Sequence, residues 1–288
     1  MTEPRTQVLH APGADLYYDV RERGGTPLLL IGSPMAAPGF ATLAGHFPDR
    51  TIVTYDPRGS ERSKRTDGAA ESTPEEHADD LRRLIAAVSD EPVDMFASSG
   101  GAVNALALVA RHPELVRTLV AHEPPTASLL PDSATALAAS RDIRDTYLRE
   151  GFGPAMAKFI ALISIQGPLP EDYLDRPAPD PAAFGLPTGD DGNRDDPMFG
   201  QNMVTCNAFE PDFKALRAAS TRIVIGVGEE TGEELTGRTS RIVAEKLGLE
   251  PTYFPSNHGG FLGGEYGQTG KPDAFAAFLR KVLDGSAE

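Results

Sequence analysis

The chain has 288 residues, of which 40% are hydrophobic and 24% charged, a composition typical of globular proteins rather than of disordered or fibrous ones. Its 42 acidic and 27 basic residues give a net charge of −15, which repels phosphate backbones and anionic membrane surfaces, so we expect neither nucleic acid nor a membrane as a partner. The single cysteine, Cys206, excludes an internal disulfide. Because the N-terminus lacks the basic start and apolar block of a signal peptide, we expect a cytoplasmic protein.

Short apolar segments alternate with helical patterns through the first 125 residues. An early pair of strands is predicted around 16–20, further strands at 27–31, 52–56, 93–97 and 115–122, and helices at 74–89 and 102–111. The first of these helices should begin with a capping box, because Thr73 precedes Pro74 and Glu76 follows three residues after the threonine. This alternation predicts a mostly parallel sheet with helices on its faces.

The alternation stops after Pro124-Pro125. Helical patterns at 134–150 and 153–165 are followed by a stretch rich in Pro, Gly and Asp at 167–197. A strand at 222–227, a helix at 236–247, a strand at 252–254 and a helix at 272–283 then restore the pattern. We therefore expect a core formed by residues 1–125 and 213–288, with residues 126–212 inserted as a helical cap. The stretch 167–197 has eight acidic residues and two arginines, so we expect an acidic lid loop that disfavours anionic substrates.

The segment Phe96-Ala-Ser-Ser-Gly-Gly101 places Ser99 between a predicted strand and a predicted helix. Small residues, Ala97 and Gly101, stand two positions away on either side. A sharp strand-to-helix turn strains the backbone of the serine and leaves no room for larger flanking side chains. The helix points its N-terminus at the serine, so the Gly100 N–H is positioned to stabilise an oxyanion. Ser99 is the predicted nucleophile, and a Gly/Ser loop without chemistry is the alternative.

A serine nucleophile needs a base, because a free hydroxyl reacts poorly at neutral pH. Of the six histidines, His258 follows the last predicted strand, where a loop at the carboxyl edge of the sheet can reach Ser99. No pair of histidines has metal-ligand spacing, and two prolines rather than a helix follow His122-Glu123, which excludes a zinc motif. The sequence also lacks a phosphate-binding or dinucleotide-binding glycine motif, and we expect neither a metal nor a cofactor.

The order of these elements, the turn at Ser99, the segment Asp56-Pro-Arg-Gly-Ser-Glu-Arg-Ser63 and the late His258 together resemble the α/β-hydrolase superfamily. The resemblance covers nearly the whole chain. It implies a mostly parallel central sheet with helices on both faces, a helical cap inserted after the sixth strand, and a catalytic triad. It also implies that the Asp-Pro-Arg-Gly run supports the structure rather than the chemistry.

The acid of the triad has more than one candidate. Most of the superfamily places an aspartate after the seventh strand, where this chain has Thr231 preceded by Glu229 and Glu230. Haloalkane dehalogenases and zearalenone lactonases take the acid from the end of the sixth strand, where this chain has Glu123. The run His122-Glu-Pro-Pro-Thr126 is similar to the lactonase pattern. The resemblance therefore favours Glu123, with Glu230 or Glu229 as the alternative acid.

A second oxyanion donor is expected from the loop that follows the strand at 27–31. Pro34 has no N–H, so the Ser33 N–H is the predicted donor and the Met35 N–H the alternative. In the cap, helical spacing singles out four candidate substrate contacts, although the same spacing also suits the cap interior. These residues are Met156, Phe159, Ile160 and Met203.

Together these residues predict a serine hydrolase that cleaves a carboxylic ester or lactone through an acyl-enzyme, with Ser99, His258 and Glu123 as its triad. The resemblance to zearalenone lactonases favours a bulky apolar small molecule as substrate, and a homo-oligomer is compatible with the sequence. One alternative is a cofactor-free perhydrolase or haloperoxidase. Another is a non-catalytic small-molecule receptor on the same fold. A serine at position 99 argues against dehalogenases and epoxide hydrolases, whose nucleophile is an aspartate.

Overall fold

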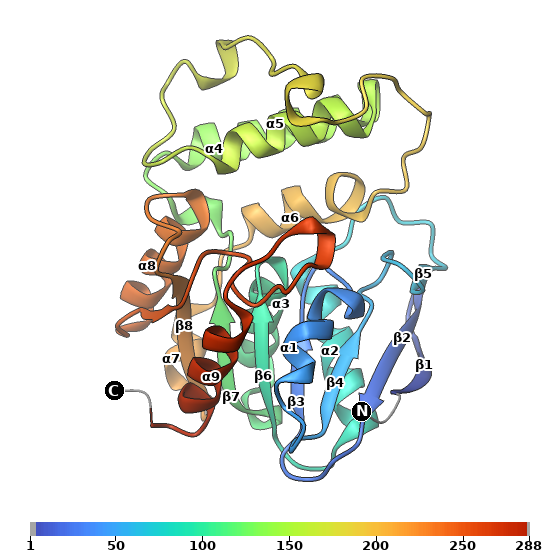
Figure 1. The fold of residues 1–288 in the computed structure, drawn as a ribbon, viewed down its shortest axis with the longest axis vertical. Coiled ribbons are helices and arrows are strands. Elements are labelled where there is room, and N and C mark those ends of the chain that lie inside the picture. The colour runs from blue at the N-terminus through green and yellow to red at the C-terminus, as the bar shows by residue number, and fades with distance from the viewer. Residues whose placement is uncertain (1–3, 287–288) are drawn as a thin grey trace.

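A computed structural model describes residues 4–286, and its centre is a nine-stranded mixed sheet (Figure 1). The strands are β1 (Arg5–Ala11), β2 (Ala14–Arg21), β3 (Leu28–Ile31), β4 (Ile52–Tyr55), β5 (Lys64–Arg65), β6 (Val93–Ser98), β7 (Val116–His122), β8 (Arg222–Gly228) and β9 (Thr252–Phe254). Their order is β1-β2-β4-β3-β6-β7-β8-β9, with β5 beside β2. Within this order, neighbours among β4, β3, β6, β7, β8 and β9 pair in parallel, and β2 pairs antiparallel with β1, β4 and β5. Side chains that follow the parallel strands therefore share one edge of the sheet.

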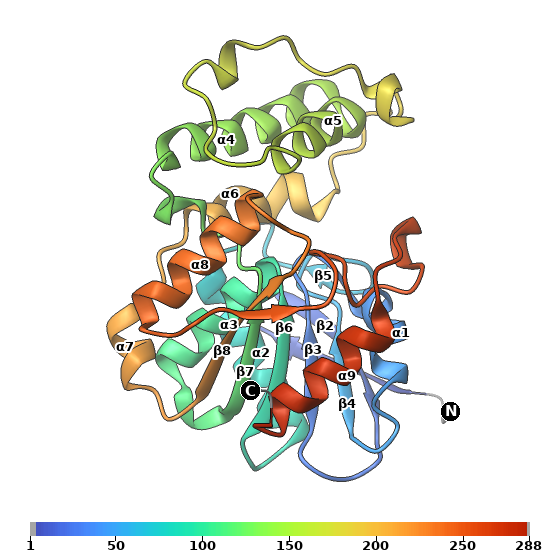
Figure 2. The same ribbon diagram turned by 60° about the vertical axis from the view of Figure 1, so that its left-hand side comes forward.

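Helices cover both faces of this sheet. The helices are α1 (Ala41–Gly45), α2 (Pro74–Val88), α3 (Gly100–Arg111), α4 (Ser133–Glu150), α5 (Phe152–Ile163), α6 (Met203–Ala208), α7 (Phe213–Ala218), α8 (Leu235–Leu247) and α9 (Pro272–Leu283). One face packs against α2, α3, α7 and α8, and the other against α1 and α9 (Figure 2). None of the helices within residues 4–286 combines the length and hydrophobicity needed to cross a bilayer.

Strand β3 shows how the two faces arise from an unbroken apolar run. Leu29 and Ile31 join the cluster under α2 and α3, whereas Leu28 and Leu30 join the cluster under α1 and α9. Successive side chains of a strand point to opposite faces, so a strand covered on both sides must be apolar at every position. The continuous apolar segments of the sequence are therefore the central strands.

The chain leaves the sheet after β7 and returns at β8, and the residues between β7 and α7 form a helical insertion above the carboxyl edge of the strands (Figures 1 and 2). The insertion has its own apolar interior. Buried side chains in it include Ile143, Tyr147, Leu162 and Phe199. The strand before the insertion is β7, rather than the sixth strand expected from the sequence, because Lys64–Arg65 forms a two-residue strand with no apolar pattern of its own.

Helix α2 begins at the predicted capping box, which the structure confirms. The Glu76 N–H donates to Thr73 Oγ1 at 3.3 Å, and the Thr73 N–H donates to Glu76 Oε2 at 3.0 Å. Two N–H groups without helical partners are thereby satisfied, and Pro74 occupies the first helical position, where its missing N–H carries no cost. The local sequence thus fixes where α2 starts.

The arginine of the Asp-Pro-Arg-Gly run is buried against α2. Arg58 Nε and Nη2 each donate to one oxygen of Asp80 at 2.7 Å, and the two side chains are 3% and 0% exposed. Burial raises the pKa of the Asp80 carboxyl above its ordinary value, although the Arg58 guanidinium opposes this shift. The pair joins the loop after β4 to the helix that packs beside the nucleophile helix, which gives Arg58 a structural role.

Removing one partner of this pair should destabilise the fold. In Asp80→Asn, the buried Arg58 guanidinium loses its bidentate carboxylate partner and keeps the partly exposed Glu76, at 3.1 Å, as a counter-charge, and we expect the free energy of unfolding to fall by about 3 kcal/mol in a urea titration. Asp79→Asn is the matched control, because Asp79 pairs with Arg82 and Arg83, which are about one-third exposed, and its loss should cost less than about 1 kcal/mol. Equal effects of the two variants would contradict a structural role for the pair.

Candidate active site

Ser99 lies at a strained turn between β6 and α3. Its backbone has φ 57° and ψ −129°, an arrangement that costs a non-glycine residue about 1–3 kcal/mol and persists where the surroundings enforce it. The Ser99 N–H donates to the His122 carbonyl at 2.9 Å, and a Cβ on Gly101 would lie 2.6 Å from the Ile31 carbonyl oxygen. Strands β7 and β3 thus hold the turn on both sides. Ser99 stays partly exposed, whereas Ser98 before it is buried.

Glu123 follows β7 directly and also has a positive φ, 51°, which turns its side chain into the protein. The residue is fully buried, and its carboxylate accepts three hydrogen bonds. Oε1 accepts from the Gly228 N–H at 2.8 Å, and Oε2 accepts from the Thr236 hydroxyl at 3.0 Å and from His258 Nδ1 at 2.6 Å. Burial alone would raise the pKa of this carboxyl, but the hydrogen bond and charge of His258 hold the pKa well below its ordinary value. Glu123 is therefore ionised.

His258 lies on the loop after β9 and bridges Glu123 and solvent, with its side chain 40% exposed. Burial lowers the pKa of the imidazole, but the hydrogen bond and negative charge of Glu123, together with the charge of Glu234, raise it above its ordinary value overall. Because an ionised carboxylate only accepts hydrogen bonds, Nδ1 carries the proton and Nε2 has a free lone pair. This is the tautomer that a general base requires.

The structure brings Glu123, and not the alternative acids, to His258. Glu230 is exposed and pairs with Lys271, and Glu229 is exposed after β8. Thr231 stands where most of the superfamily places its aspartate, and its side chain is buried beside Gly228. The geometry around the histidine therefore favours the acid at the end of β7.

The loop after β3 lies directly beside the nucleophile turn. A Cβ on Gly100 would collide with the Ser33 carbonyl oxygen, so Gly100 is needed for this close approach. Ser33 is 5% exposed, and within residues 4–286 no acceptor takes its backbone N–H. The backbone of Met35 packs against Gly32, and its side chain packs against Gly39. Ser33 is thus the residue of this loop that the structure places next to Gly100.

The candidate substrate contacts of the cap divide into two groups. Met203 is buried in the apolar interior of the insertion, and Met156 and Phe159 pack against that interior. Ile160 is partly buried and lies outside this cluster. The first three therefore contribute to cap packing, as their helical spacing also allowed.

Sequence reasoning missed several groups that surround the triad. Gly228 and Thr236 bind the Glu123 carboxylate, but a backbone N–H and a threonine at a helix start leave no pattern in the sequence. His122 is fully buried, and its Nδ1 lies 3.1 Å from Ser98 Oγ. Burial lowers the pKa of His122 to about 4, so the ring is neutral. The available signal was its position at the end of an apolar strand in the middle of the sheet, where side chains on both faces are covered.

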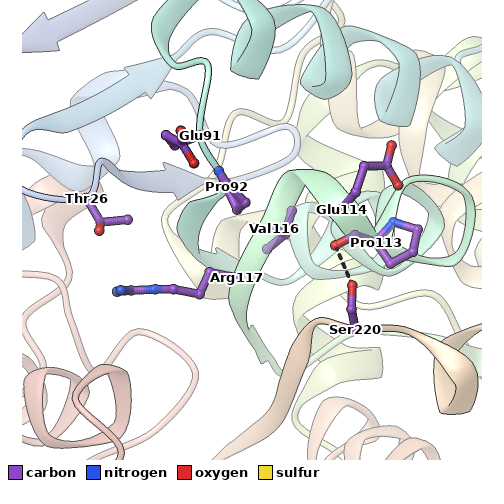
Figure 3. Close-up of a pocket in the computed structure, with 8 residues that line it drawn as sticks. All are labelled: Thr26, Glu91, Pro92, Pro113, Glu114, Val116, Arg117 and Ser220. Atoms are coloured by element: carbon purple, nitrogen blue, oxygen red, sulfur yellow. Dashed lines mark hydrogen bonds between the residues drawn. The ribbon is translucent and has the colours of Figure 1, made fainter.

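A shallow pocket of about 480 Å³ lies at the opposite edge of the sheet (Figure 3). Its lining residues are Thr26, Glu91, Pro92, Pro113, Glu114, Val116, Arg117 and Ser220. These residues precede or begin β3, β6, β7 and β8, whereas Ser99, Glu123 and His258 each follow a strand. The pocket contains no histidine, and its Arg117 is paired with Asp94. It is therefore separate from the candidate active site.

Comparison with known proteins agrees with this architecture. Residues 28–181, more than half of the chain, match the family model described as alpha/beta hydrolase fold. The protein named uncharacterized hydrolase YraK, from Bacillus subtilis, is 30% identical over 261 residues, which span 88% of this chain and 89% of that protein. The chain therefore belongs to the α/β-hydrolase family, and the fold expected from the sequence is confirmed.

Solved structures show the same fold at low sequence identity. The enol-lactonase from Burkholderia xenovorans LB400 superposes with a TM-score of 0.68 at 16% identity, over 96% of this chain and 100% of that one. A thermophilic esterase from Thermogutta terrifontis superposes with a TM-score of 0.68 at 17% identity, over 100% of both chains. At these identities the likeness establishes the arrangement of elements rather than a shared substrate.

Proposed function

We propose that this chain is a serine hydrolase that cleaves a carboxylic ester or a lactone through an acyl-enzyme, with Ser99 as nucleophile, His258 as base and Glu123 as acid. The observation that carries the proposal is the 2.6 Å contact between His258 Nδ1 and the buried Glu123 carboxylate. All three residues follow strands at the carboxyl edge of one sheet, and the serine occupies the strained turn that exposes its hydroxyl.

The geometry supports the following acylation step. Ser99 Oγ attacks the carbonyl carbon while His258 Nε2 takes the hydroxyl proton, and Glu123 stabilises the resulting imidazolium. The carbonyl oxygen becomes an oxyanion that the N–H groups of Gly100 and Ser33 stabilise. When the intermediate collapses, the bond to the leaving oxygen breaks, and His258 gives its proton to that oxygen. The products are an acyl-enzyme and an alcohol.

Deacylation repeats the same proton transfers with water as nucleophile. His258 Nε2 takes a proton from water, the new oxygen bonds to the acyl carbon, and Ser99 Oγ leaves with the proton returned by the imidazolium. For a lactone the alcohol stays attached to the acyl group, so a single hydroxy acid is released. No group beyond the side chains and backbone donors named above is required by either step.

For the substrate we propose a neutral, apolar ester or lactone. Proteins of similar structure include an enol-lactonase and carboxylesterases, which supports this bond class. The segment 167–197 of the cap carries exposed acidic residues, among them Asp175 and Asp191, whose negative charge repels anionic substrates. A panel of p-nitrophenyl esters of increasing chain length together with neutral and carboxylated lactones tests this. Faster turnover of the carboxylated members would contradict it.

The raised pKa of His258 predicts the pH dependence of the reaction. Only the neutral imidazole accepts a proton, so the rate of Ser99 labelling by a fluorophosphonate should fall at acid pH with a midpoint above 6.5. The negative charge of Glu234 stabilises the imidazolium, so Glu234→Gln should lower the pKa of His258 and move the midpoint to lower pH. Glu230→Gln, which only breaks a surface pair with Lys271, should leave the midpoint in place. A shift to higher pH in Glu234→Gln would contradict the assignment.

A further inference from the structure

The insertion returns to the core through an irregular segment. A π-helical turn at Met198–Asn202 continues into α6, and the Met203 N–H donates to the Met198 carbonyl five residues back. Figure 2 shows α6 between the cap helices α4 and α5 and the upper edge of the sheet. Turns of this kind interrupt the usual spacing of side chains and are frequent at functional sites. This one brings the end of the cap next to the nucleophile turn.

The same segment contacts the residues proposed to hold the oxyanion. Asn202 Nδ2 donates to Ser33 Oγ at 3.1 Å, and each of the two residues is 5% exposed. One helical turn later lies Cys206, whose Sγ would be 3.3 Å from a Cβ on Gly100. A cap segment therefore packs against both the loop after β3 and the start of α3.

Asn202 is held in place from the core side. Thr205 Oγ1 donates to the carbonyl oxygens of Asn202, at 2.9 Å, and of Ser72, at 2.6 Å. The Ser72 N–H donates in turn to the Gln201 carbonyl at 3.1 Å. Because these contacts fix the backbone on either side of the Asn202 side chain, its amide has a defined position relative to Ser33.

The hydrogen-bond roles leave one proton unused. The amide Nδ2 of Asn202 only donates, so Ser33 Oγ accepts and keeps its own hydroxyl proton. Within residues 4–286 no acceptor takes this proton. We propose that the Ser33 hydroxyl, oriented by Asn202, donates a third hydrogen bond to the oxyanion, beside the N–H groups of Ser33 and Gly100. Asn202 acts here as a positioning residue. The inference rests on the proposed serine-hydrolase function.

Two substitutions separate this role from packing. Ser33→Ala removes the hydroxyl and keeps the backbone N–H. Asn202→Asp keeps the size of the side chain but replaces the donor with a carboxylate, which accepts the Ser33 proton and withdraws it from the oxyanion. Asn207→Asp is the matched control, because Asn207 Nδ2 donates to Ser140 Oγ at 2.8 Å in an equivalent buried pair within the cap.

The experiment measures kcat and KM for p-nitrophenyl butyrate, the rate of fluorophosphonate labelling of Ser99, and thermal unfolding of each variant. We expect Ser33→Ala to lower kcat and the labelling rate about 10²-fold with little change in KM, since one oxyanion donor contributes about this much. Asn202→Asp should match it, and the double variant should lose no more than Ser33→Ala alone. Asn207→Asp should lower the melting temperature and leave kcat unchanged.

Other results would contradict either the third oxyanion donor or the proposed function. A Ser33→Ala enzyme with wild-type kcat, a fully active Asn202→Asp enzyme, or additive losses in the double variant would each overturn the third donor while leaving the triad in place. If Asn202→Asp does not fold, Ser33→Ala decides alone, because it removes a single oxygen atom. Wild-type protein whose Ser99 resists labelling would overturn the proposed function and the third donor together.

Discussion

Ser99→Ala should abolish turnover, with kcat lowered at least 10³-fold on any ester or lactone that the wild-type protein hydrolyses. The alanine keeps the fold of the turn but has no oxygen to form the acyl-enzyme, so only the oxyanion donors and substrate positioning remain. A fluorophosphonate probe, read by mass spectrometry of the intact protein, should add one adduct to the wild type and none to this variant.

Ser98→Ala is the control for that experiment. Ser98 is buried and its hydroxyl forms a hydrogen bond with His122, whereas Ser99 is partly exposed at the strained turn. The probe should therefore still label Ser99 in the Ser98→Ala variant. A wild-type protein that stays unlabelled would favour the non-catalytic receptor among the alternatives. An adduct on a residue other than Ser99 would leave the fold intact and overturn the choice of nucleophile.

The central part of the fold was predictable because its signals are local. Strand β3 is a continuous apolar run, and α2 has a capping box at its start, so each element is specified by residues within it. The two-residue strand β5 is different, because Lys64 and Arg65 form a strand through pairing with β2, which lies far earlier in the chain, rather than through a pattern of their own. Elements that depend on a distant partner leave little trace in sequence patterns.

The candidate site likewise contains some features that have a local sequence signal and others that depend on distant contacts. The small neighbours of Ser99 are a requirement of the turn itself, and the position of Glu123 at a strand end is visible in the sequence. The contact between Asn202 and Ser33 spans 169 positions and depends on a π-helical turn, which has no sequence signature. The sequence therefore predicts the candidate triad but not the way in which the cap packs against the core.

The strongest test of the acid is Glu123→Gln, which should lower kcat about 10⁴-fold with little loss of stability. The glutamine has the shape of the glutamate, so its side chain can still occupy the same buried site. The Gly228 N–H can only donate, which orients the amide oxygen of the glutamine toward it and the NH₂ group toward His258 and Thr236. The Thr236 hydroxyl can rotate to accept, and Nδ1 of the imidazole must then accept as well.

This reversal places the proton of His258 on Nε2, the nitrogen that has to accept the proton of Ser99. In this tautomer His258 cannot act as the general base. Loss of the nearby negative charge also removes the stabilisation of the imidazolium, so raising the pH should not restore the rate. The measurement compares kcat and the urea midpoint of Glu123→Gln with those of Glu230→Gln, whose parent side chain pairs with Lys271 at the surface and should tolerate the change. A Glu230→Gln enzyme that loses more activity than Glu123→Gln would transfer the role of acid to the loop after β8.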